Sequence, residues 1–88
     1  SFKNVKNTED WKTIVELNPD GNVKQYVYFN KGALNKSIHF DYNPGGKFKI
    51  EKITSIFDDD GICYRQVNNS TEKTRIRDRL TLEWGPWK

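Results

Sequence analysis

Clusters of turn-forming residues recur along the chain about every 8–12 residues, and this rhythm constrains the fold more than any other feature. The clusters are residues 18–22, 30–35, 43–46, 58–61 and 68–71. Glycine and asparagine tolerate positive φ, proline presets φ, and Asp or Asn side chains bond to their own backbone, so each cluster predicts a turn. Such short segments between turns favour strands over helices. We therefore predict an all-β antiparallel meander.

The segments between these turns alternate apolar with polar residues, which is typical of strands with one buried and one solvated face. The six predicted strands cover residues 11–17, 23–29, 37–42, 47–57, 62–67 and 74–84. Within the fourth, the apolar positions change face between Ile50 and Ile53, following Phe48 and preceding Phe57, which predicts a bulge near Lys52. Residues 8–10 are expected to cap a short helical turn before the first strand.

The chain has 88 residues, so we expect one small β domain over residues 1–88. Six antiparallel strands leave sheet edges that a protein must protect, and closing toward a small barrel or half-barrel is our expected solution. A single cysteine, Cys63, excludes an internal disulfide framework and a cysteine-based zinc site. We expect Cys63 to be a small apolar filler, with no metal or cofactor.

The distribution of positive charge is the main functional feature, although the net charge is only +3. Residues 74–84 place a run of cations on one face of the predicted last strand, namely Lys73, Arg75, Arg77 and Arg79. Same-face residues of a strand repeat at about 6.6–6.8 Å, so the run forms a line about 20 Å long. A phosphate backbone has a comparable spacing, and guanidinium groups bind phosphate oxygens through paired hydrogen bonds.

This line predicts a non-catalytic binding module for an anionic partner, with single-stranded nucleic acid as the first choice and an acidic protein surface as another. Sites for single strands combine basic grooves with aromatic platforms. Tyr26 and Tyr28 are the expected platforms because they share the predicted solvent face with Lys24; Tyr64 and Trp87 are further candidates. The structural alternative is that Glu16, Glu51 or Asp41 on neighbouring strands pairs with the arginines and neutralises the line.

A second class of function is a protein-interaction or assembly module, such as an inhibitor, an immunity factor or an accessory subunit. It would use an exposed edge strand, also as a homodimer, together with Trp87. Trp87 follows Gly85 and Pro86, which end the last predicted strand, so it either folds back over the barrel end or stays exposed as an anchor.

The tryptophan of the first predicted strand, Trp11, followed by Pro19-Asp20-Gly21, resembles lipocalin-like barrels. This resemblance implies a third alternative, a small carrier of an apolar ligand, and we carry no site residue over from it. Six short strands leave little interior volume for such a ligand once aromatic side chains fill the barrel.

Two polar groupings suggest other chemistry, and each has a simpler interpretation. His39 and Asp41 share a strand face, as a general base and its orienting carboxylate would. The chain has only this one histidine, so we expect a solvated pair, no catalytic residue and no enzyme activity. Residues 58–60 could offer oxygens to calcium, but Gly61 comes too early for an EF-hand loop, which indicates a polar turn.

No apolar run approaches the roughly 20 residues needed to span a bilayer, so we expect no membrane partner. The sequence leaves the compartment open, with an intracellular setting slightly favoured.

Overall fold

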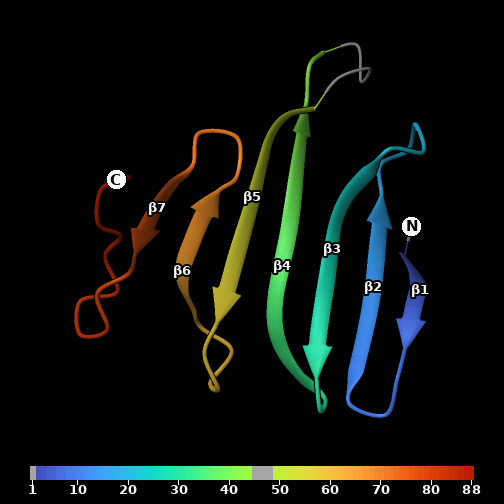
Figure 1. Cartoon of the computed structure of the whole chain (residues 1–88), viewed down its shortest axis with the longest axis horizontal. Coiled ribbons are helices and arrows are strands. Elements are labelled where there is room, and N and C mark those ends of the chain that lie inside the picture. Colours follow the sequence, from blue (N-terminus) through green and yellow to red (C-terminus); the bar gives the residue numbers. More distant parts are fainter. Residues whose placement is uncertain (1, 45–48) are drawn as a thin grey trace.

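The computed structural model describes residues 2–44 and 49–88 and shows a single antiparallel sheet (Figure 1). Seven strands follow one another in the order β1-β2-β3-β4-β5-β6-β7. The predicted all-β meander is therefore confirmed, with one strand more than expected. Each strand contacts only the strands next to it in sequence, so β1 and β7 lie at opposite ends of the sheet. Among the described residues the sheet stays open and does not close into a barrel.

The strands are β1 (Phe2–Asn7), β2 (Trp11–Leu17), β3 (Val23–Asn30), β4 (Ala33–Tyr42), β5 (Lys49–Phe57), β6 (Cys63–Asn68) and β7 (Lys73–Ile76). The first five predicted strands correspond to β2 through β6, with ends that differ by at most four residues where the structure describes them. The predicted change of phase near Lys52 is a register shift at Ile50, because Asp41 pairs with Glu51 while Tyr42 pairs with Lys49. Residues 45–48, which include the predicted turn glycines and Phe48, lie outside the described part.

Two predictions at the ends of the chain are wrong. The last predicted strand, residues 74–84, ends at Ile76, because the Asp78 carboxylate accepts the backbone N–H groups of Leu80 and Thr81 and turns the chain. Residues 8–10 form a hairpin turn between β1 and β2 and no helical turn: Thr8 N–H donates to the carbonyl of Trp11, and Trp11 N–H donates to Thr8 Oγ1. The hydroxyl of Thr8 thus caps a hairpin.

The strand β1 was not expected because Phe2–Asn7 has a weak alternation and four polar or charged residues around Val5. It forms because β2 offers it a ladder that runs from Phe2 opposite Glu16 to Asn7 opposite Lys12, with a register shift between Asn4 and Lys6. Pairing with an existing strand can override a weak local preference for extended structure.

The turns follow from their residues. Lys31 and Gly32 both have positive φ, 50° and 81°, which is the two-residue turn that matches the twist of paired strands. The turns at 18–22 and 58–62 repeat one design: the N–H of the first residue donates to the carbonyl of the fifth, Asn22 or Ile62. The predicted turn clusters at these places are therefore confirmed.

Cross-strand register assigns the side chains to two faces, because directly opposed residues of antiparallel strands point to the same side. One continuous row runs through Lys3, Val15, Tyr26, Ile38, Thr54, Val67 and Thr74. The next row on this side runs through Thr13, Tyr28, Lys36, Ile56, Arg65 and Ile76, and Phe40 opposite Lys52 adds a third. We call this side the cationic face, after its charged residues Lys3, Lys36, Lys52 and Arg65.

The opposite side is the mixed face. Its rows run through Phe2, Glu16, Gln25, His39, Ile53, Asn68 and Lys73, and through Asn4, Ile14, Val27, Ser37, Ser55, Gln66 and Arg75. Two shorter rows close it at the strand ends, Lys12 with Phe29 and Leu34, and Asp41 with Glu51.

The core is thin because only one layer of backbone is present. The molecule measures 39 × 35 × 18 Å, and the buried apolar side chains among the described residues are Val15 (8% exposed) and Phe40 (7% exposed). Both belong to the cationic face. The apolar residues on both faces therefore remain partly in contact with solvent.

Candidate functional site

The predicted line of four cations is broken in the structure. Lys73 and Arg75 project from β7 on the mixed face, while Arg79 lies in the loop after Asp78 and is exposed. A 20 Å track needs an extended strand through residue 79, and the turn at Asp78 removes it. The prediction of one continuous arginine track is therefore wrong, for the reason that ends β7.

Two of the arginines contact tryptophan rings. The guanidinium carbon of Arg75 lies 4.5 Å from the ring centre of Trp84 and 4.7 Å from that of Trp87, and that of Arg77 lies 4.7 Å from Trp84. Arg75 Nε also donates to Gln66 Oε1 at 2.8 Å. The proposed carboxylate partners Glu16, Glu51 and Asp41 play no part: within the described ranges no arginine forms an ion pair with a carboxylate.

The chain after β7 folds back along that strand and brings the indole rings to the arginines. Thr74 and Lys88 exchange two backbone hydrogen bonds, of 2.9 and 3.0 Å, and Gly85 N–H donates to the carbonyl of Ile76. Trp87 is half-buried in this arrangement. It thus folds back, as one of the two expected outcomes, but against the edge strand and not over a barrel end.

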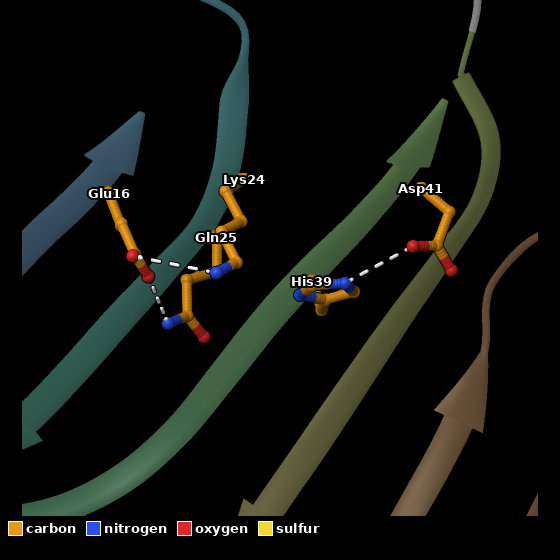
Figure 2. A network of polar contacts seen from close by, with 5 residues as sticks. All are labelled: Glu16, Lys24, Gln25, His39 and Asp41. Atoms are coloured by element: carbon orange, nitrogen blue, oxygen red, sulfur yellow. Dashed lines mark hydrogen bonds and ion pairs between the residues drawn. The ribbon is translucent and has the colours of Figure 1, made fainter. Parts of the chain in front are cut away.

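The predicted tyrosines lie on the far side of the sheet, since Tyr26 and Tyr28 are on the cationic face, opposite to Arg75. Lys24 does not join them as predicted: its ammonium lies 3.6 Å from Glu16 of the mixed face, because the β2–β3 register shifts beside it (Figure 2). The candidate set therefore separates into a tyrosine part and an arginine part that cannot contact one short ligand segment together.

The tyrosines form an aromatic cluster with a lysine that sequence reasoning did not select. The rings of Tyr26 and Tyr28 are 6.5 Å apart, Tyr26 meets Phe40 edge-to-face at 6.0 Å, and Lys36 Nζ lies 4.8 Å from the Tyr28 ring centre. Lys36 occupies this place because it is the direct partner of Tyr28 in the β3–β4 ladder. A regular hairpin about the turn at 31–32 would pair Tyr28 with Asn35, and the register shift between Tyr28 and Phe29 brings Lys36 opposite Tyr28 instead.

A cleft opens beside this cluster. It has a volume of about 300 Å³ and is lined by Thr8, Trp11, Thr13, Tyr28 and Lys36. Trp11 is 42% exposed, so its indole is accessible at the rim. An aromatic wall on two sides with an ammonium group nearby suits a flat, electron-rich ring attached to an anion.

The charges on this face all have one sign. Among the described residues assigned to it by register, the charged ones are Lys3, Lys36, Lys52 and Arg65, and none is Asp or Glu. Lys3, Lys52 and Arg65 are exposed. The mixed face instead holds Glu16, Asp41 and Glu51 together with its cations. Within the described rows of this face, the charged side chains are therefore all basic.

The predicted His39–Asp41 pair forms on the mixed face (Figure 2). His39 Nε2 lies 3.2 Å from Asp41 Oδ1, and the two side chains are 40% and 54% exposed. Asp58, from the acidic turn, uses Oδ1 to accept the N–H groups of Asp60 and Ile62. That carboxylate holds the turn together, as expected for a polar turn.

Two groups have shifted pKa values. Burial raises the pKa of Tyr42, helped by the charge of Asp20 and by Tyr26, and the Tyr42 hydroxyl donates to the carbonyl of Val23 at 2.6 Å. The backbone N–H groups of Thr81 and Leu80 lower the pKa of Asp78. Asp78 lies in the loop after β7, whereas Tyr42 follows Phe40 by two residues in β4 and interacts with Tyr26 of the cationic face.

Comparison with protein-family models, curated proteins and solved structures finds no match to this chain. The described residues include no helix able to span a membrane.

Proposed function

We propose that the protein is a non-catalytic binding module that engages single-stranded nucleic acid through its cationic face. The observation that carries the proposal is the cleft between Trp11 and Tyr28, with Lys36 beside it, on a face whose charged side chains are all basic. Proteins that hold single strands combine stacking platforms with a basic surface in this way. A base would stack in the cleft while the phosphates follow Lys36, Lys52 and Arg65.

The arginines first favoured by the sequence are less suited to this role. Arg75 and Arg77 already form cation–π contacts with an indole ring, and they would lose these contacts if they moved to bind phosphate. Lys73 is exposed but lies on the mixed face, where Glu16, Asp41 and Glu51 would repel a polyanion. We therefore assign the interface to the tyrosine part of the predicted set.

A matched pair of substitutions tests the proposal. Tyr28→Leu removes a stacking platform from the cationic face, and Phe29→Leu removes an aromatic ring from the next residue on the other face. Stacking contributes about 1–3 kcal/mol per base, so we expect Tyr28→Leu to weaken binding of a fluorescein-labelled oligothymidylate about 5- to 150-fold. Phe29→Leu should leave the affinity within about twofold. Fluorescence anisotropy at low salt measures both.

Salt dependence provides a second readout of the same complex. Each phosphate contact on a single strand contributes about 0.7 to the slope of log affinity against log salt. Lys36→Gln should lower the slope by about that amount, whereas Lys12→Gln, on the mixed face, should not. Absence of oligonucleotide binding by the wild-type protein at low salt would refute the proposed function.

A further inference from the structure

The described fold exposes more surface than a compact monomer of its size. A monomer of 10.4 kDa is expected to expose about 5,400 Å². The chain exposes 6385 Å², which is about 1,000 Å² more. Its radius of gyration is 14.3 Å, against about 12 Å for a compact domain of this length. A standard interface buries about 800 Å² on each partner, so the excess is close to the area that one partner loses in such an interface.

We propose that a second copy of the chain packs on the mixed face to form a two-layer sandwich. The face has apolar residues in three neighbouring rows: Ile14 lies opposite Val27, Phe29 follows Val27 by two residues in β3, and Ile53 lies in β5. Two sheets that pack face to face lie about 10 Å apart and bury such residues between them. The proposal is independent of the nucleic-acid interface, which lies on the other side.

The charges that β2 places on the mixed face suit a second copy. In β2, Lys12, Ile14 and Glu16 project to this side in succession. A twofold axis across the strands at Ile14 places Ile14 on its own equivalent and Glu16 over Lys12 of the second copy, with the reciprocal pair on the other side. A twofold interface requires this self-complementarity.

The cationic face is unsuited to the same contact. Packing it on its own copy would oppose Lys3, Lys36, Lys52 and Arg65 with the same four cations and no carboxylate from the faces in contact. The sandwich we propose leaves this face on the outside of both copies. It also places two cationic faces on opposite sides of the dimer.

Neighbouring residues of β5 supply a matched test. Ser55 lies on the mixed face and accepts a hydrogen bond from Gln66 Nε2 at 3.0 Å, while Thr54 lies on the cationic face and donates to Asn69 Oδ1 at 2.7 Å. Ser55→Lys and Thr54→Lys each remove one side-chain hydrogen bond and add one charge to the same strand, but on opposite faces. Circular dichroism verifies that both variants keep their strands.

Sedimentation equilibrium measures the result. We expect the wild-type chain and Thr54→Lys to have twice the mass of one 10.4 kDa chain at micromolar concentration. Ser55→Lys puts unpaired charge into the interface and should raise the dimer dissociation constant by about 100-fold or more. A wild-type monomer up to millimolar concentration would overturn the proposal and assign the face to another partner. Equal behaviour of the two variants would also overturn it. A wild-type chain that is dimeric but does not bind oligonucleotide would refute the proposed function and leave the dimer proposal standing.

Discussion

Single side chains decide where the strands of this protein end, and Asp78 has the largest effect. Its Oδ1 accepts the N–H groups of Leu80 and Thr81 at 2.8 and 2.9 Å, and these bonds favour the charged carboxylate. The pKa of Asp78 is lowered for this reason. The charged carboxylate therefore stabilises the loop fully at pH values above the unfolded-state pKa of about 3.9. This stabilisation is lost as the pH falls through the lower pKa of the folded state.

We therefore predict that Asp78→Ala releases the loop at neutral pH. The Leu80 and Thr81 amide resonances should shift toward unfolded positions at pH 7, as measured by NMR, and should match those of the wild-type protein near pH 2. Asp59→Ala, in the acidic turn, is the control and should leave both amides unchanged. Unaltered Leu80 and Thr81 resonances in Asp78→Ala at pH 7 would contradict this assignment.

Asn68 makes one set of hydrogen bonds that the sequence predicts and another that it does not. Asn68 belongs to a predicted turn cluster, and its Oδ1 does accept the N–H groups of Ser70 and Thr71. It is also 7% exposed, and its amide group donates to Glu51 Oε1 across the sheet. The turn could be predicted because its bonds are local. The bond to Glu51 could not, because it depends on the β5–β6 register.

At the scale of elements, the segment after β7 protects one edge of the sheet. Lys88 and Thr74 exchange backbone hydrogen bonds, which occupy part of the otherwise open edge of β7. A Cβ added at Gly85 would lie 3.2 Å from the carbonyl oxygen of Ile76, which shows how closely the segment approaches β7. The tryptophans and arginines stabilise this pairing from the mixed face.

The two tryptophans should differ in their effect on this element. Trp84 contacts both Arg75 and Arg77, whereas Trp87 contacts Arg75 alone. Each cation–π contact contributes about 0.5–1 kcal/mol, so Trp84→Leu should lower the protection of the segment by about 1–2 kcal/mol and Trp87→Leu by about half as much. Hydrogen exchange of the Gly85 and Lys88 amides measures the loss. A larger loss for Trp87→Leu would contradict the assignment of contacts.

At the scale of the whole molecule, one layer of strands leaves little apolar surface away from water. Association with a second copy would then supply part of the stability, because a partner that binds only the folded chain raises the free energy of unfolding. We predict that the melting temperature rises with protein concentration in wild type and in Thr54→Lys, and not in Ser55→Lys. Differential scanning calorimetry over a hundredfold range of concentration measures this. A melting temperature independent of concentration in all three proteins would contradict the prediction.

The sequence by itself determined the strands and their turns, because alternation with period two and the turn preferences of Gly, Asn, Asp and Pro act over a few residues. Five of its six predicted strands are confirmed, together with the bulge in β5 and the approach of His39 to Asp41. Tyr26 and Tyr28 were selected from the same alternation. All of these depend on neighbours in the chain.

Only the tertiary structure decided which strand faces meet and what the arginines contact. The break at Asp78, the return of the last residues along β7 and the partnership of Lys36 with Tyr28 each join positions whose contact depends on register or on chain reversal. A shift of one residue in register moves every side chain to the other face of a sheet. For this reason the charge of each face could be read only after all six ladders were known.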